Sequence, residues 1–334
     1  MRRLLLIVAV ALAGISGVAV AEEAPAATDV LRMSHFQAKG THNSYHRRPM
    51  TPPLHLVIED WDYAHPPLDV QLGQEGVRQF ELDVHWDPVG KRFEVLHERF
   101  VDPESTCPLL EACLRTAAAW SDANPGHHPI FFHIEPKDAE DCTVSPLHCI
   151  AGHYDALDAE IRAILEDGRD RLLTPDEVQA DSPTLRQAIE GVGWPALDDH
   201  RGEMVFLLHD HGHHRDAYVR RDADGTPQLG GRAMFVEGDL DPGDPYAAVA
   251  AIMSMNDPTD PRIPIAVGSG FLVRTYPGSG EYDEALRSGA HMISTNWPCP
   301  RTDDAGRCLK IPGGSPLRCN PISARPACSA EQLE

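Results

Sequence analysis

Apolar runs of strand length recur along the chain and alternate with amphipathic segments of helical length. The strand-like runs cover residues 35–39, 77–84, 93–96, 129–135, 204–209, 233–237, 271–276 and 291–296. Some of them, such as residues 204–208, are apolar at every position, which is typical of parallel strands covered on both faces. Helical patterns cover residues 109–121, 154–166, 183–190, 245–255 and 281–288. This alternation predicts an α/β fold, a TIM-type (β/α)8 barrel in a single domain.

The two ends of the chain follow other patterns. Two arginines precede a short apolar run that ends in Ala19-Val20-Ala21, which indicates a secretory signal peptide over residues 1–21. A membrane anchor is the alternative, but the run is short for a span. We expect a disordered leader over residues 22–31 and the barrel over residues 32–298. Residues 299–334 are rich in Cys, Pro and Gly and predict a disulfide-rich C-terminal tail.

Eight cysteines support export, because disulfides persist in oxidising compartments. We therefore expect a secreted protein, extracellular or periplasmic. Cys107 with Cys113 and Cys142 with Cys149 are spaced to close small loops. The last four cysteines allow three pairings, between which the sequence does not choose: Cys299, Cys308, Cys319 and Cys328. Zinc held by cysteines is disfavoured because the C-x-x-C spacing is absent.

The formal net charge is −22. So acidic a protein is not expected to bind nucleic acid, nor to adhere to an anionic membrane by charge alone. It is well suited to hold a hard cation. We expect a monomer.

Carboxylates stand where several apolar runs end. Glu81 and Asp83 are two apart in one strand-like run, so both side chains point to the same face, and like charges so placed need a cation or a shared proton. Glu135 ends another run, and Asn43 adds an amide oxygen. Such oxygen donors suit Ca²⁺ or Mg²⁺, whereas the alternative is a set of surface carboxylates paired with arginines. Further polar residues lie at strand ends: His209, Glu237, Arg274 and Asn296.

Two histidines flank this acidic set. His42 follows the first run and His97 follows the run at 93–96, and an imidazole titrates near neutral pH. A pair of imidazoles beside a cation suits phosphodiester cleavage, in which one accepts a proton from the attacking hydroxyl and the other protonates the leaving oxygen. A lone histidine would more often be structural.

Other polar residues fit a substrate. Lys137 shares a strand face with Glu135, so it faces either a phosphate or that carboxylate. Arg274 and Tyr276 share one face and offer a phosphate fork and a flat wall; a surface arginine beside a core tyrosine is the alternative. Residues 209–214 are rich in histidine, and we expect a polar connection there rather than a dedicated transition-metal site, with His209 facing the substrate.

These motifs resemble a known family. The segments 41–45, 81–83, 96–97, 134–137 and 274–277 are similar, in order, to those of the calcium-dependent phosphoinositide-specific phospholipases C. The match is best with the secreted bacterial branch of these TIM-barrel phosphodiesterases, and it extends from about His35 to Trp297. The resemblance implies cleavage of phosphoinositides to diacylglycerol and inositol phosphates through a cyclic phosphodiester, with the inositol 2-hydroxyl as the nucleophile.

The resemblance also assigns roles to individual residues. It implies that His42 and His97 are catalytic and that Ca²⁺ is held by four ligands, Asn43, Glu81, Asp83 and Glu135. It assigns Arg274 to the substrate phosphate and Tyr276 to the inositol ring. His209 and its neighbours stand where lysines for ring phosphates would be sought. This leaves unphosphorylated phosphatidylinositol or a soluble glycerophosphoinositol as a substrate at least equal to a polyphosphorylated one, with transient contact to a membrane surface.

Two other functions compete with this one. A glycerophosphodiester phosphodiesterase also uses a Glu-x-Asp strand followed by a histidine, but it opens with His-Arg-Gly and carries Pro-Glu-Asn. Here the opening is Thr41-His42-Asn43 and no Pro-Glu-Asn follows. The third possibility is an inactive secreted barrel that acts as a binding protein, which the intact pair of His42 and His97 disfavours.

Overall fold

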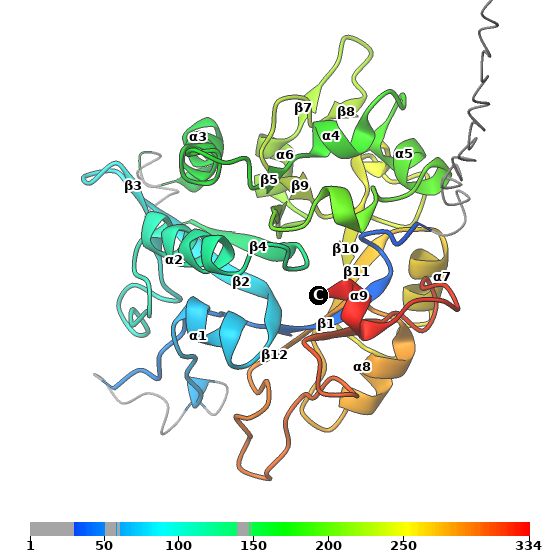
Figure 1. Cartoon of the computed structure of the whole chain (residues 1–334). Helices are drawn as coiled ribbons and strands as arrows, with labels where there is room; N and C mark the ends of the chain where they lie inside the picture. The colour runs from blue at the N-terminus through cyan, green and yellow to red at the C-terminus, as the bar shows by residue number, and fades with distance from the viewer. Residues whose placement is uncertain (1–29, 51–57, 59–60, 139–146, 148) are drawn as a thin grey trace, which may run out of the picture. The chain divides into compact units, whose positions relative to one another are not determined.

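The buried apolar runs form a curled sheet of mainly parallel strands in the computed structural model (Figure 1). The structure describes residues 30–50, 58, 61–138, 147 and 149–334. The signal peptide expected over residues 1–21 and nearly all of the leader expected over residues 22–31 lie outside these ranges. Residues Leu31–Glu334 form one compact unit, which is the part described below.

The parallel strands that carry the site follow one another along the chain. They are β1 (Phe36–Thr41), β2 (Val77–Asp87), β4 (Ile130–Lys137), β6 (Met204–Leu208), β9 (Phe235–Val236), β10 (Ile252–Ser254), β11 (Leu272–Thr275) and β12 (Met292–Thr295). Shorter or antiparallel strands accompany them: β3 (Arg92–Val95), β5 (Leu172–Leu173), β7 (Arg220–Arg221), β8 (Pro227–Gln228) and β13 (Leu317–Cys319).

Helices connect the strands and lie outside the sheet, with α1, α2 and α3 on one side and α7 and α8 on the other (Figure 1). The α-helices are α1 (Leu68–Gly73), α2 (Leu110–Ala123), α3 (Tyr154–Leu165), α4 (Pro175–Gln179), α5 (Leu185–Gly191), α6 (His213–Tyr218), α7 (Arg262–Gly268), α8 (Tyr282–Ser288) and α9 (Ala330–Leu333). The part of the chain that the structure describes also contains the 3-10 helices η4 (Ile150–Gly152), η5 (Leu197–Asp199) and η6 (Ala247–Val249). No helix of the described residues is long and apolar enough to cross a membrane.

The strand order brings distant parts of the sequence together. The sheet runs β10–β11–β12–β1–β2–β4–β6, and β9 pairs in parallel with the end of β6. A parallel bridge between Glu237 and Ile252 then links the end of β9 to β10, and the Gly238 amide donates to the Ile252 carbonyl at 2.9 Å. The carboxyl ends of these parallel strands therefore lie along one edge of the curled sheet.

Two predicted elements differ from the sequence-based expectation. The run at 93–96 is not a parallel strand, because β3 pairs antiparallel with β2 and forms a hairpin arm. The helix expected at 245–255 is wrong: only η6 is helical there, and β10 follows it. A short run that is apolar on all sides does not distinguish helix from strand, and pairing with β11 decides the outcome.

Side-chain alternation gives the sheet one aromatic face. Phe80, Phe132 and Phe206 occupy matching positions on β2, β4 and β6. The Phe132 ring centroid lies 5.3 Å from that of Phe80 and 5.0 Å from that of Phe206, and all three side chains are fully buried. Residues one position further along each strand point to the opposite face, which carries the polar groups of the site.

The C-terminal residues are joined to the sheet. β13 pairs antiparallel with β1, and disulfides link Cys299 to Cys308 and Cys319 to Cys328. A third disulfide joins Cys107 and Cys113, as the spacing predicts. The pairing expected for Cys142 involves a residue outside the described ranges.

The aromatic face is expected to stabilise the sheet strongly. Phe132→Ala removes the central ring and leaves a cavity, so the free energy of unfolding should fall by about 3–5 kcal/mol in urea denaturation. Ile265→Ala on the exposed face of α7 is the control and should change it by no more than ~0.5 kcal/mol. Equal losses in the two variants would contradict this account.

Candidate active site

Three carboxylates from two neighbouring strands meet on the polar face of the sheet. In the β2–β4 register, Glu81 lies beside His133 and Asp83 beside Glu135. Oxygen atoms of Glu81, Asp83 and Glu135 all lie within 4.8 Å of one another. Two of the three side chains are almost completely buried, and only Glu135 is partly exposed. The structure therefore brings together the acidic residues that the sequence selects.

Asn43 lies in the loop after β1, next to Ser44. The loop is fastened to β2 by a reciprocal pair of bonds: the Ser44 amide donates to the Glu81 carbonyl at 2.8 Å, and the Glu81 amide donates to Ser44 Oγ at 2.8 Å. Asn43 itself has a φ of 43°, a left-handed conformation that asparagine tolerates. Its Oδ1 atom is buried and has no hydrogen-bond partner among the described residues.

The cluster packs three carboxyl groups beside two cations, Arg274 and Lys137. Burial and the neighbouring Glu135 raise the pKa of Asp83 to about 8. Burial also raises the pKa of Glu81, but Arg274 and nearby histidines outweigh it and hold that pKa at about 2. Charged carboxylates buried together are costly unless a cation balances them. Three carboxylates and an unpartnered amide oxygen fit a hard divalent cation such as Ca²⁺.

His42 lies between the acidic cluster and an aromatic wall. Its Nδ1–H donates to Asn296 Oδ1 at 3.0 Å, so in the neutral ring Nε2 carries the free lone pair. Nε2 is 3.5 Å from Glu81, and the ring stacks on Tyr276 with centroids 4.5 Å apart. Burial lowers the pKa of His42. This imidazole is therefore set up to accept a proton.

His97 has the opposite character. Its Nδ1–H donates to Asp102 at 2.9 Å, and His46 Nε2–H donates to the same carboxylate oxygen at 2.9 Å. Burial lowers the pKa of His97, but the bond to Asp102 and the charges of Asp83 and Asp102 outweigh it, so the pKa is raised. A neutral and a protonated imidazole at one site are what a base and an acid require.

Arg274 and Lys137, the cationic side chains expected to bind the substrate, both contact the acidic cluster. Arg274 is buried, pairs with Glu81 through Nη2 and donates from Nη1 to Asn256 at 2.6 Å. Lys137 Nζ lies 2.5 Å from Glu135 and 3.3 Å from Asp83, and these carboxylates raise its pKa despite burial. The salt bridge that the sequence leaves open for Lys137 is present.

His209 and Tyr276, the other two residues expected to bind the substrate, follow different strands of the sheet. His209 follows β6, and its Nδ1 lies 2.5 Å from Glu237. Burial lowers its pKa, but Glu237 outweighs this effect and the pKa is raised. Tyr276 follows β11 and lies beneath the Arg274 guanidinium, 5.3 Å from ring centroid to Cζ.

Several residues of the site carry no sequence pattern that selects them. Asp102 lies in a loop with other acidic residues, and only the fold shows that it binds two histidines. Asn256 directly follows residues 245–255, where a helix is expected from the sequence but the structure has β10. Tyr63 stacks on His46 at 4.3 Å and its hydroxyl is 3.5 Å from His42 Nδ1, yet it comes from an irregular segment before α1.

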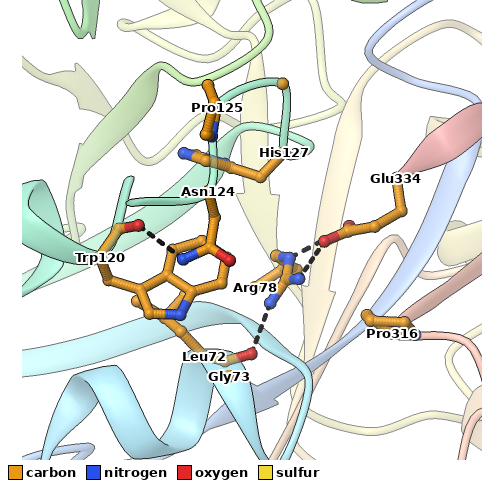
Figure 2. A pocket seen from close by; sticks show the side chains of 10 residues that line it. Leu72, Gly73, Arg78, Trp120, Asn124, Pro125, His127, Pro316 and Glu334 are labelled. Atoms are coloured by element: carbon orange, nitrogen blue, oxygen red, sulfur yellow. Dashed lines mark hydrogen bonds and ion pairs between the residues drawn. The ribbon is translucent and has the colours of Figure 1, made fainter. Parts of the chain in front are cut away.

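A separate pocket in the structure is not lined by any of these site residues. It measures about 450 Å³ and is lined by Leu72, Gly73, Arg78, Trp120, Asn124, Pro125, Gly126, His127, Pro316 and Glu334. Figure 2 shows Arg78 between Trp120 and Glu334, where it lies 5.0 Å from the indole centroid and pairs with the carboxylate. Arg78 is at the start of β2, so this hollow lies toward the amino end of the strand.

The fold and the site together define an α/β enzyme in which two histidines lie near an acidic cluster. The sequence model of the family described as "Phosphoinositide phospholipase C, Ca2+-dependent" matches residues 31–94 and 91–321. The chain therefore belongs to this family of phospholipase C-like phosphodiesterases. No curated protein sequence matches the chain significantly.

Solved structures share the fold at low sequence identity. A calcium-dependent phosphoinositol-specific phospholipase C from Pseudomonas sp, described as a myoinositol complex, has a TM-score of 0.59 and 15% identity, and the match covers 86% of this chain and 95% of that one. A Ca²⁺-dependent phosphatidylinositol-specific phospholipase C from Streptomyces antibioticus has a TM-score of 0.57 and 19% identity, with 80% and 95% covered.

The bond from Asp102 should set the basic limb of the pH–rate profile. The rate should fall as the pH rises through the pKa of His97, which lies above its usual 6.5. Asp102→Asn removes a negative charge, so this limb should move to lower pH, with a loss on the order of 10- to 100-fold in kcat. Exposed Asp198→Asn is the control. An unshifted limb in Asp102→Asn would show that His97 is not the titrating acid.

Proposed function

We propose that this protein is a secreted Ca²⁺-dependent phosphoric diester hydrolase that cleaves phosphatidylinositol-type lipids to diacylglycerol and cyclic or free inositol phosphate. The observation that carries the proposal is the pair of imidazoles with opposite pKa shifts beside the carboxylates. The myoinositol complex of the Pseudomonas relative supports an inositol headgroup.

The two histidines divide the proton transfers. His42 Nε2 takes the proton of the inositol 2-hydroxyl as that oxygen forms a bond to phosphorus. His97 gives its proton to the glycerol oxygen as the phosphorus–oxygen bond to diacylglycerol breaks. Each imidazole ends in the other's starting state, so water can then open the cyclic diester with the roles reversed.

Asn43, Glu81, Asp83 and Glu135 would hold the Ca²⁺ ion. When bound, the ion supplies positive charge that stabilises the phosphate oxygens and lowers the pKa of the attacking hydroxyl. Asn43 supports this assignment with its unpartnered Oδ1, and Asp83 with its buried carboxyl group, whose raised pKa a bound cation would offset.

The neighbouring side chains suit an inositol phosphodiester. Arg274 offers a guanidinium fork for the phosphate, and Tyr276 gives the ring a flat wall continuous with His42. Lys137 and His209 line the remaining sides, and both already contact carboxylates. Residues 209–214 offer histidines rather than lysines, which favours an unphosphorylated ring over a polyphosphorylated one.

Compartment and architecture complete the proposal. The three described disulfides support export to an oxidising compartment. The β6–β9 pairing and the bridge from β9 to β10 support a TIM-type (β/α)8 barrel over residues 32–298. We assign a monomer.

Exposed apolar side chains beside the site support transient contact with a membrane. Val89, at the turn of the β2–β3 hairpin, is 92% exposed, and Phe100, three residues after His97, is 77% exposed. Both follow the carboxyl half of β2, on the side of the sheet where the substrate is proposed to bind. Isolated apolar residues are common on surfaces, but large ones at a lipid-cleaving site can enter the bilayer.

Product analysis tests the reaction. Purified protein should convert phosphatidylinositol vesicles to cyclic inositol phosphate, detected by ³¹P NMR, with activity lost in excess EGTA and restored by Ca²⁺. His42→Ala and His97→Ala should each lower turnover at least ~100-fold. His200→Ala, a histidine paired with Glu203 away from the site, should remain active.

Other results would assign another function. Glycerol 3-phosphate from a deacylated diester would identify a glycerophosphodiester phosphodiesterase. A folded protein inert on every phosphodiester would indicate a binding protein, and full activity in EGTA would remove the calcium assignment.

The exposed apolar side chains of Val89 and Phe100 should affect activity only on lipid surfaces. Phe100→Ser should weaken binding to phosphatidylinositol vesicles and lower vesicle hydrolysis about tenfold, because a partly buried aromatic ring contributes about 1.5 kcal/mol or more. Cleavage of soluble glycerophosphoinositol should stay unchanged. Ile265→Ser, which removes an exposed apolar side chain on α7, is the matched control. Equal losses on both substrates would argue against a membrane role for Phe100.

A further inference from the structure

Three side chains on adjacent strands converge beside the proposed calcium site. His133 lies on β4, His209 follows β6, and Glu237 follows β9, and these strands are neighbours in the sheet. One potential ligand atom from each lies within 4.8 Å of the other two. The rings of His133 and His209 are 5.7 Å apart, centroid to centroid. This cluster draws on three separate segments, so the histidine-rich residues 209–214 alone do not reveal it.

His133 has no visible role in the protein's own hydrogen bonding. Its side chain is fully buried, and neither ring nitrogen has a partner among the described residues. A neutral imidazole carries one N–H donor and one acceptor lone pair, and leaving such a buried group unsatisfied costs about 1–3 kcal/mol. A bound ion or an ordered water would satisfy this buried imidazole.

Glu237 is held in position as metal-binding carboxylates are. The Ser254 amide donates to its Oε2 at 2.9 Å and Ser254 Oγ donates to its Oε1 at 2.5 Å. His211, on the exposed loop, places Nε2 3.8 Å from Glu237 Oε2. Outer contacts of this type orient the ligands of a metal site.

We propose that His133, His209 and Glu237 bind a transition-metal ion, with Zn²⁺ the best match to two imidazoles and one carboxylate. Zinc and related ions prefer nitrogen donors, whereas the cluster of Glu81, Asp83 and Glu135 offers only oxygens. The two sites therefore select different ions although they lie on the same face of the sheet. The bound ion would link β4, β6 and β9 and satisfy the buried His133.

Metal binding to the full chain tests this directly. Protein stripped with EDTA and returned to buffer with excess Ca²⁺ should bind one equivalent of Zn²⁺, measured by mass spectrometry of metal content and by competition with a chromophoric chelator. Co²⁺ should give the visible absorption of a nitrogen-ligated ion. Zn²⁺ should also raise the melting temperature, since it binds only the folded state.

Variants separate this site from its neighbours. Loss of an outer contact typically weakens metal binding ~10- to 100-fold, and we expect an effect of this size for Ser254→Ala. Loss of a direct ligand should weaken Zn²⁺ binding by more than this, in each of the variants His133→Ala, His209→Asn and Glu237→Gln. Circular dichroism identifies any variant that fails to fold, and the other ligand variants then decide. Asp83→Asn should keep Zn²⁺ binding.

The matched control is His213→Ala. It disrupts a different cluster, in which His213 Nε2 lies 2.9 Å from Asp138, and should leave Zn²⁺ binding intact. No stoichiometric Zn²⁺ in the wild-type protein, retained binding in the folded ligand variants, or loss of binding in His213→Ala would overturn the proposal. Calcium-dependent activity measured in zinc-free buffer reports separately on the proposed function.

Discussion

The site depends on the repulsion among carboxylates that the sheet forces together. Glu81 and Asp83 share a strand face, and the β2–β4 register adds Glu135. Folding must place these charges out of water, so the surrounding groups exist largely to offset them: Arg274 against Glu81, and Lys137 against the other two. Burial and Glu135 raise the pKa of Asp83 despite Lys137, whereas Arg274 and nearby histidines outweigh burial and hold the pKa of Glu81 low.

The same arrangement of charges explains why the pKa values of His42 and His97 shift in opposite directions. His42 lies beside both Glu81 and Arg274, whose effects oppose each other, so burial decides and the pKa falls. His97 has no such cation against it at comparable strength and is tied to Asp102, so its pKa rises. Asp102 in turn is positioned by a hydrogen bond from His46. His46 therefore influences the pKa of the proposed acid, His97, through Asp102.

Sequence alone predicts the parts of this structure that depend on local periodicity. Glu81 and Asp83 could be placed on one face because strand side chains alternate, and the helical pattern expected over residues 281–288 is present as α8. Asp102 and His133 could not be assigned, because their roles arise from contacts between distant segments. The helix expected at 245–255 failed for the same reason: strand pairing with β11, not local propensity, fixes β10.

In the proposed mechanism, cation binding and phosphate binding are coupled at this site. Arg274 and a divalent ion compete for the same carboxylate of Glu81, and Lys137 competes likewise for Asp83 and Glu135. An ion held by the cluster weakens the hold of these carboxylates on Arg274 and Lys137, which leaves both cations better able to bind phosphate oxygens. By reciprocity, a phosphate diester that engages them strengthens the affinity of the cluster for the ion. In the proposed mechanism, these ion pairs therefore make the affinities for metal and substrate interdependent.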